Sequence, residues 1–242
     1  MQSLPRSVPN DGIERHDQVK TIFSEIAPRY DLLNHLLSLN MDRSWRRLAV
    51  DQIGWEAESS GSFLDACTGT FDLALELGDR PGFRGRIIAT DFACPMMVQG
   101  ARKIVAGPIT PVCGDSLALP FPNDNFDGAM VGFGVRNLSD LECGLRELYR
   151  VLKRGKLLVV LEFALPPNPF VRMAYLLYFR RVLPVVGRII SGHPWAYRYL
   201  PESVEEFPGP DELGLLFKKV GFEDVGWTLL TGGIAALHWG KA

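Results

Sequence analysis

The chain has few cysteines, no excess of positive charge and no long uninterrupted apolar run among its 242 residues. Its four cysteines, Cys67, Cys94, Cys113 and Cys143, show no C-x-x-C spacing, which argues against a zinc site and against a disulfide framework. Buried reduced thiols beside strand ends are the simpler interpretation, and they fit a cytosolic compartment. A net charge of −2 provides no field that would attract nucleic acid, so we expect no nucleic-acid partner.

The sequence also lacks the usual signs of export and membrane insertion. The first residues carry no basic region followed by an apolar run, so no secretory signal is expected. The most apolar long stretch, residues 163–190, is interrupted by four prolines and four arginines and does not predict a membrane span. Residues 1–14 contain two prolines and little hydrophobicity, and we expect them to be disordered.

Glycine is scarce where a nucleotide-binding loop would need it. In residues 62–75 an apolar run ends at Asp65, small residues follow around Gly69, and a helical pattern resumes, which predicts strand, turn and helix. Such a turn faces a ligand crevice in an open α/β sheet. The dinucleotide fingerprint G-x-G-x-x-G is missing, so NAD and FAD are poorly supported. The stretch is closer to the acid-x-G-x-G-x-G loop of enzymes that use S-adenosylmethionine (SAM), with Cys67 and Phe71 replacing two glycines, although alone it is more often an ordinary connection.

Strands and helices alternate along the rest of the chain. Strands are predicted at 86–91, 109–113, 126–132 and 155–163, helices at 95–104 and 140–152, and a closing hairpin at 222–230 and 234–239. The alternation implies a mostly parallel sheet with right-handed crossovers. We therefore predict an α/β fold of the Rossmann-like, class I SAM-dependent methyltransferase type, with a C-terminal antiparallel hairpin. Within a single domain, residues 15–242, we expect a helical cap of three helices at 15–55 and a helical insertion at 164–200.

Polar residues follow several of these strands, at the edge where ligands bind in such folds. Asp91 ends the second strand about 20 residues after the turn, where an acid can accept hydrogen bonds from ribose hydroxyls of NAD or SAM. Asp115 either contacts an adenine amino group or caps a turn. Arg136 and Asn137 follow the fourth strand on the ligand side, and Arg136 either meets the substrate or pairs with an acid such as Asp140.

The predicted insertion has an unusual charge pattern. From Phe163 to Pro201 there is no Asp, Glu or Lys, yet there are five arginines among many apolar residues. A long apolar helix with cationic interruptions suits a membrane surface or the wall of a lipid pocket. A core helix whose arginines pair with acids elsewhere is an equal alternative. Peripheral association with the inner face of a membrane and a homodimer therefore both stay open.

Long strings of the sequence resemble one enzyme family. They are residues 22–35 (IFSEIAPRYDLLNH), 44–47 (SWRR), 133–137 (FGVRN), 149–153 (YRVLK), 161–163 (LEF) and 197–203 (YRYLPES). From about Val19 to the C-terminus the chain is similar to the UbiE/MenG family of quinone C-methyltransferases. The resemblance implies C-methylation of a prenylated quinol, demethylmenaquinol or a polyprenyl-benzoquinol, in menaquinone or ubiquinone biosynthesis, with SAM as the methyl donor.

The resemblance also assigns site residues. It implies that SAM binds at Thr70, Asp91, Asp115 and Ser116. The positions of the residues then suggest the methionine end at the turn around Gly69 and Thr70, which follows Asp65, the ribose at Asp91, and the adenine at Asp115 and Ser116. It implies a quinol site lined by Tyr30, Arg136 and Asn137. A quinol supplies a carbon nucleophile when an oxygen loses its proton, so no metal is needed, and the protonated Arg136 suits the resulting anion. His193, Tyr30 and a water held by Asp31 stay open as the general base.

Two departures from the family pattern matter for function. Arg154 to Lys156 replace a common Pro-Gly-Gly turn, and Phe71 replaces a loop glycine. A bulky side chain at position 71 is expected to crowd the methionine pocket, because backbone must approach the ligand there. Two rival functions are therefore kept: a catalytically impaired quinone-binding or scaffold protein, and a SAM methyltransferase acting on oxygen or nitrogen of another small molecule.

Overall fold

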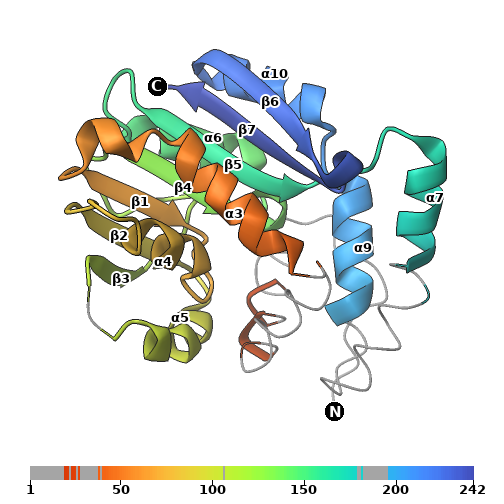
Figure 1. Ribbon diagram of the computed structural model, residues 1–242, viewed down its shortest axis with the longest axis horizontal. Coiled ribbons are helices and arrows are strands. Elements are labelled where there is room, and N and C mark those ends of the chain that lie inside the picture. Colours follow the sequence, from red (N-terminus) through yellow and green to blue (C-terminus); the bar gives the residue numbers. More distant parts are fainter. Residues whose placement is uncertain are drawn as a thin grey trace.

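The computed structural model describes residues 19–21, 23–25, 27, 38, 40–105, 107–178, 181 and 196–242. These residues form a twisted seven-stranded sheet with helices on both faces (Figure 1). The strands are β1 (Ser62–Ala66), β2 (Arg86–Asp91), β3 (Ile109–Cys113), β4 (Gly128–Gly132), β5 (Leu157–Phe163), β6 (Glu223–Leu230) and β7 (Ala235–Lys241). The helices are α3 (Met41–Gln52), α4 (Asp72–Gly78), α5 (Cys94–Gly100), α6 (Leu141–Val151), α7 (Pro169–Leu177), α9 (Ala196–Glu206) and α10 (Pro210–Val220).

The strand order is β3-β2-β1-β4-β5-β7-β6. The first five strands run parallel, and β7 pairs antiparallel with both β5 and β6. The predicted fold class, with its C-terminal antiparallel hairpin, is therefore confirmed. The order reverses between β1 and β4, and in open α/β sheets this switch point opens a ligand crevice at the carboxyl ends of the strands.

Alternate residues of the central strands enter two hydrophobic cores. Phe63 faces α3 and α4, whereas its neighbour Leu64 faces α6 and α10. All five residues of β1 are buried, as is usual for a parallel strand covered on both faces. The helix α3, which lies across the sheet in Figure 1, contributes Trp45 and Ala49 to the same core as α4. The two cores hold the sheet rigid beneath the crevice.

Most predicted boundaries are confirmed, with small corrections. The strand β4 begins two residues later than predicted, because Phe126 makes only an isolated bridge to Leu152. The helix predicted at 95–104 ends at Gly100 and continues as a 3₁₀ turn, Ala101–Lys103. Part of the predicted cap, and the insertion from residue 179 to 195 apart from Arg181, lie outside the described residues. The division of the chain into cap, domain and insertion therefore stays a prediction.

The expectation of reduced thiols is wrong for two of the cysteines. Cys94 and Cys113 form a disulfide, with their Cα atoms 5.6 Å apart, while Cys67 and Cys143 are free. Cys94 follows β2 and Cys113 ends β3, and these strands are paired neighbours. Spacing along the sequence could not reveal this pairing, because the sheet creates it.

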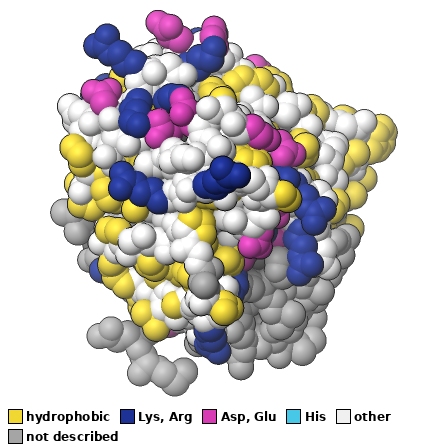
Figure 2. Space-filling model, turned by 60° about the vertical axis from the view of Figure 1, so that its left-hand side comes forward, with side chains coloured by type: hydrophobic (Ala, Val, Ile, Leu, Met, Phe, Trp, Pro, Cys, Tyr) yellow, Lys and Arg dark blue, Asp and Glu magenta, His cyan; other side chains and the backbone are white. Residues whose placement is uncertain are grey.

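Surface charges are mixed in sign. On the face drawn in Figure 2, Lys and Arg side chains alternate with Asp and Glu side chains and neither sign forms a continuous field. Typical ion pairs are Lys156 with Glu58 and Lys241 with Asp224, with nitrogen–oxygen distances of 2.6 and 2.7 Å. Pairs as exposed as these contribute little to stability.

Candidate active site

The turn between β1 and α4 is held in a tight conformation. Cys67, Gly69 and Phe71 all have positive φ angles, of 52°, 57° and 71°. The helix α5 approaches this turn so closely that a Cβ at Gly100 would lie 2.7 Å from the Cα of Thr70. Glycine is therefore required at position 100, and Thr70 itself is buried beneath the turn.

Asp65 anchors this turn from inside the protein. Its Oδ2 accepts hydrogen bonds from Thr68 Oγ1 at 2.6 Å and from the backbone nitrogen of Ala74 at 3.0 Å. The second bond satisfies a free N–H group in the first turn of α4. Burial raises the pKa of Asp65 to about 7, against the lowering effect of these two bonds. The carboxylate is not among the groups that line the cleft, so its contribution there is to hold the turn.

Asp91 joins the end of β2 to the same turn. Its Oδ2 accepts from the backbone nitrogen of Gly69, and its Oδ1 from that of Ala93, both at 2.8 Å. Burial raises the pKa of Asp91 to about 6, because the loss of hydration outweighs the hydrogen bonds. Each carboxylate oxygen has a second lone pair, so Asp91 can still accept from a ligand.

A narrow cleft opens beside these groups, at the carboxyl ends of β1, β2 and β4. Its lining combines one carboxylate, backbone and amide groups with aromatic and apolar walls: Phe23, Cys67, Gly69, Asp91, Phe92, Met96, Phe133, Gly134, Asn137 and Leu138. A nucleoside needs a carboxylate that accepts hydrogen bonds from its ribose hydroxyls, and apolar walls beside its flat base. The residues therefore fit SAM.

The residues predicted for adenine lie beside the cleft. The Oγ of Ser116 is 3.4 Å from Cys67 Sγ, and Ser116 is buried. Asp115 accepts a hydrogen bond from the backbone nitrogen of Leu117 at 2.9 Å, which is the turn-capping arrangement. Neither residue is among those that line the cleft, so their contact with a ligand stays a prediction.

Phe71 does not crowd the cleft, contrary to expectation. Its side chain is 0% exposed and belongs to the core formed by α3, α4 and the sheet. The ring packs into this core and does not line the cleft. The reason for expecting a catalytically impaired protein therefore no longer holds.

Arg136 and Asn137 lie in a 3₁₀ turn, η4 (Val135–Asn137), after β4. The Nη1 of Arg136 donates to Glu162 Oε1 at 2.6 Å and to the backbone oxygen of Phe133 at 2.7 Å. The guanidinium carbon is 5.4 Å from the centre of the Phe163 ring. Arg136 therefore does pair with an acid, as one of the two alternatives held, but the acid is Glu162. Asp140 instead caps α6, where its Oδ1 accepts from the backbone nitrogen of Cys143. Sequence analysis missed Glu162, although an acid at the end of an apolar strand was a visible signal.

Asn137 is held from the other side by α9. Its Oδ1 accepts a hydrogen bond from the hydroxyl of Tyr199 at 2.9 Å, and its Nδ2 lies 3.4 Å from the backbone oxygen of Phe133. Tyr30, the third residue predicted for the quinol site, lies outside the described residues, as do the candidate bases His193 and Asp31.

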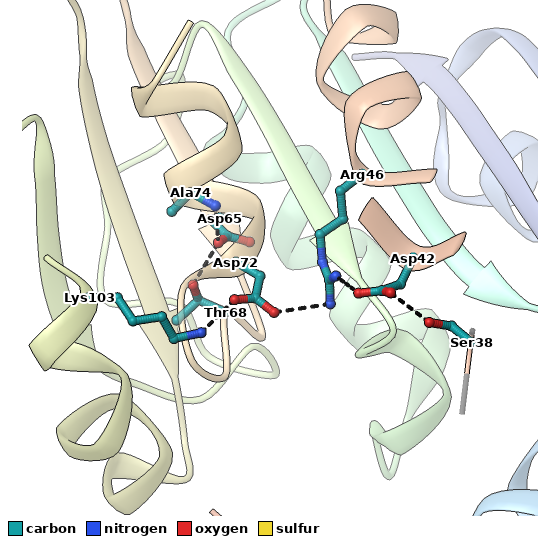
Figure 3. A network of polar contacts seen from close by, with 8 residues as sticks. All are labelled: Ser38, Asp42, Arg46, Asp65, Thr68, Asp72, Ala74 and Lys103. Carbon is teal, nitrogen blue, oxygen red and sulfur yellow. Dashed lines mark hydrogen bonds and ion pairs between the residues drawn. The ribbon is translucent and has the colours of Figure 1, made fainter. Parts of the chain in front are cut away.

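A chain of buried and half-buried charges runs behind the turn (Figure 3). Arg46 of α3 pairs with Asp42, and its Nη2 lies 3.2 Å from Asp72 Oδ2 at the start of α4. Lys103 pairs with the other oxygen of Asp72, and Ser38 donates to Asp42. Alternating charges compensate one another's burial. The network ties α3 to the first turn of α4 and thereby supports the turn that carries Gly69.

The fold and the cleft define a class I SAM-dependent methyltransferase. A solved structure with the same fold is a SAM-dependent methyltransferase from Thermotoga maritima (TM-score 0.61, 19% identity, 91% of this chain and 98% of that one). The model of the ubiE/COQ5 methyltransferase family matches residues 12–242, and the chain belongs to this family. The predicted class of enzyme and its cofactor SAM are therefore confirmed.

Two curated relatives are similar over almost the whole chain. The Demethylmenaquinone methyltransferase of Thermus thermophilus is 50% identical, over 90% of this chain and 99% of that relative. The Ubiquinone/menaquinone biosynthesis C-methyltransferase UbiE of Geobacter sulfurreducens is 43% identical, over 94% of this chain and 90% of that relative.

Proposed function

We propose that this protein methylates a ring carbon of a prenylated quinol, demethylmenaquinol or a polyprenyl-benzoquinol, in menaquinone or ubiquinone biosynthesis. The observation that carries the proposal is the cleft at the switch point, where Gly69, Asp91 and Asn137 meet in a chain of the ubiE/COQ5 family. The names of the Thermus and Geobacter relatives support a quinol as the methyl acceptor.

The chemistry requires a reduced ring. When a quinol oxygen loses its proton, charge spreads to the neighbouring ring carbon, which can then attack a methyl group. SAM supplies that methyl group on a sulfonium, and the carbon–sulfur bond breaks as the new carbon–carbon bond forms. The ring carbon then loses its own proton and the ring regains its aromaticity. The protein must chiefly align the two partners and stabilise the phenolate charge.

The residue roles follow from position. Asp91 holds the ribose hydroxyls, and the turn at Gly69 and Thr70 holds the methionine end. Asp115 and Ser116 lie toward the adenine. Asn137, together with Arg136 and Tyr30, orients the quinol ring. The support for this arrangement is that Gly69, Asp91 and Asn137 share one cleft, while the side chains of Arg136 and Asn137 are fixed by hydrogen bonds.

The test is a product analysis. The protein is incubated with SAM and either a chemically reduced prenylated naphthoquinol or the corresponding benzoquinol, and the position of the new methyl group is determined by NMR. We expect methylation of a ring carbon and no reaction with the oxidised quinones. Methylation on oxygen, or binding of SAM without transfer to either quinol, would contradict the proposal.

We further propose that α7 rests on an anionic lipid surface. Phe170, Met173 and Leu177 on this helix are 77%, 65% and 60% exposed, and Arg172 and Arg181 border a shallow groove beside them. An exposed apolar face flanked by cations and free of acids suits a negatively charged membrane, from which a prenylated substrate could be drawn. Within the described part of the chain, no helix is both long and apolar enough to cross a bilayer.

A further inference from the structure

Glu162 is a carboxylate inside an otherwise apolar strand. It is the penultimate residue of β5, whose sequence is LLVVLEF, and it is 1% exposed. Burying a carboxylate is strongly unfavourable unless it is paired and hydrogen-bonded. Its surroundings therefore indicate why this position tolerates a charge.

Glu162 bonds to Arg136 at two points. Its Oε1 accepts from Arg136 Nη1 at 2.6 Å, and its Oε2 accepts from the backbone nitrogen of Arg136 at 3.3 Å. A further bond to Oε1 comes from the backbone nitrogen of Phe163 at 2.9 Å. One carboxylate thus holds both the side chain and the backbone of Arg136.

The turn from Phe133 to Asn137 depends on the same contacts. It starts with a bond from the nitrogen of Phe133 to the oxygen of Leu161, at 2.7 Å, and Phe133 has a positive φ of 57°. The oxygen of Phe133 then accepts from Arg136 Nη1 and lies within reach of Asn137 Nδ2. A non-glycine residue with positive φ needs such support. Phe133, Gly134 and Asn137 line the cleft, so the support reaches the ligand.

We propose that Glu162 is a positioning residue for methyl transfer, which fixes Arg136 and the 133–137 turn so that Asn137 faces the methyl donor. The inference rests on the proposed function above. Glu162 itself acts through Arg136 and is separated from the cleft by the turn. Its charge also balances that of Arg136, so the turn is held by an ion pair and does not carry an uncompensated buried cation.

The titratable groups that face Glu162 include Arg136 from η4, Tyr175 from α7 and Cys67 from the turn after β1. Glu162 raises the pKa of both the Tyr175 hydroxyl and the Cys67 thiol. The pKa of both is raised mainly by burial, so neither ionises near neutral pH. A change in the pH profile on substituting Glu162 therefore reports on Arg136 and the acceptor.

The experiment compares Glu162→Gln with the wild type, using SAM and a reduced prenylated quinol. The substitution keeps the shape of the Glu162 side chain and removes its charge. The guanidinium of Arg136 is then held less firmly, and its positive charge is no longer balanced. We expect kcat to fall about tenfold or more, with the Kd of SAM changed less than twofold. An unbalanced cation favours the phenolate form of the acceptor. In a plot of kcat against pH, the rise on the acidic side should therefore occur about one pH unit lower than in the wild type.

Glu147→Gln is the matched control. Glu147 also pairs with an arginine, Arg150, at 2.7 Å and accepts from a backbone nitrogen, that of Leu119, at 2.8 Å, but it lies on α6 and outside the cleft. This control should melt earlier without changing kcat or the pH profile. If Glu162→Gln behaves in the same way, Glu162 is only structural and the inference is overturned.

Two further measurements separate a failure of this inference from a failure of folding or of the proposed function. If Glu162→Gln does not fold, Glu162→Asp keeps the charge but withdraws the carboxylate, and its kcat should be reduced with an unshifted acidic limb. A Glu162→Asp enzyme with wild-type kcat would overturn the inference. A wild-type protein that binds SAM but methylates neither quinol defeats the proposed function and the inference together, whereas an active wild type with an unaffected Glu162→Gln defeats the inference alone.

Discussion

The cofactor side and the acceptor side of the cleft are built differently. On the cofactor side, Asp65 and Asp91 bind backbone nitrogens of the turn and of the segments that follow β1 and β2. On the acceptor side, Arg136 is held by a residue 26 positions away and Asn137 by one 62 positions away. The first arrangement joins the ends of the neighbouring strands β1 and β2, and the acids that make it stand where the sequence pattern predicts the ends of buried strands. The second exists only after β5 and α9 have been brought to the turn, so its disruption should damage catalysis and stability together.

The largest effect is expected at the Arg136 and Glu162 pair. Arg136→Ala leaves a buried carboxylate uncompensated, which costs about 3–5 kcal/mol of folding free energy, and should lower turnover about a hundredfold or more. The double variant Arg136→Met with Glu162→Leu removes both charges, so it should regain most of the lost stability but not the turnover. Melting temperature and kcat, measured in parallel, check this. Recovery of turnover in the double variant would show that the pair is only structural.

The next largest effect is expected at Phe71, which lies in the turn between β1 and α4 but packs its ring into the hydrophobic core. Phe71→Ala should cost about 3–5 kcal/mol of folding free energy through the cavity it leaves. Phe71→Gly leaves a similar cavity but relieves the positive φ, so it should be no less stable than the alanine variant, by denaturant unfolding. The Kd of SAM should match the wild type in both folded variants. Tighter binding by the glycine variant would mean that the ring does crowd the ligand.

A smaller effect is expected from pH on the cofactor side. Ligand hydroxyls donate to the ionised form of Asp91, whose pKa is raised to about 6 by burial. Protonation below that pH removes the acceptor, so the Kd of SAM should rise about tenfold per pH unit as the pH falls below 6. Titrations in calorimetry from pH 5 to 8 check this, and Asp91→Asn should flatten the dependence. An equally steep dependence in that variant would assign it to another group.

The smallest effect concerns the exposed face of α7, on the opposite side of this helix from the buried Tyr175. Arg172 and Arg181 changed together to Glu should weaken flotation with anionic vesicles by about 1 kcal/mol for each lost cation, before repulsion is counted. Arg84→Glu with Arg154→Glu makes the same charge change near the opposite ends of the strands and should leave flotation close to the wild type. Equal binding by both double variants would exclude this surface. A concentration-dependent dimer lost in the α7 variant would instead favour a second copy as the partner.

The same contrast explains which features sequence analysis recovered. Asp91 was expected at the ligand edge because an acid at the end of a buried strand has a fixed place in an open sheet, and it does line the cleft. The mostly parallel sheet with its closing hairpin follows from the alternation of strands and helices. Glu162 was missed because its partner is set by the β4 and β5 pairing. The disulfide of Cys94 and Cys113 was missed because β2 and β3 bring those residues together. The direction of the Phe71 ring depends on a left-handed turn that composition does not reveal.

In the proposed arrangement SAM is held at the end of β2 and the acceptor at the end of β4. The most direct measurement is the Kd of SAM at pH 7.5 by calorimetry for the wild type, Asp91→Asn, and Asp79→Asn, an exposed acid at the end of α4. Loss of a charged acceptor is worth about 1.5–3 kcal/mol per hydrogen bond, so Asp91→Asn should bind at least tenfold more weakly. Asp79→Asn should bind like the wild type. Equal affinity in all three proteins would contradict the account.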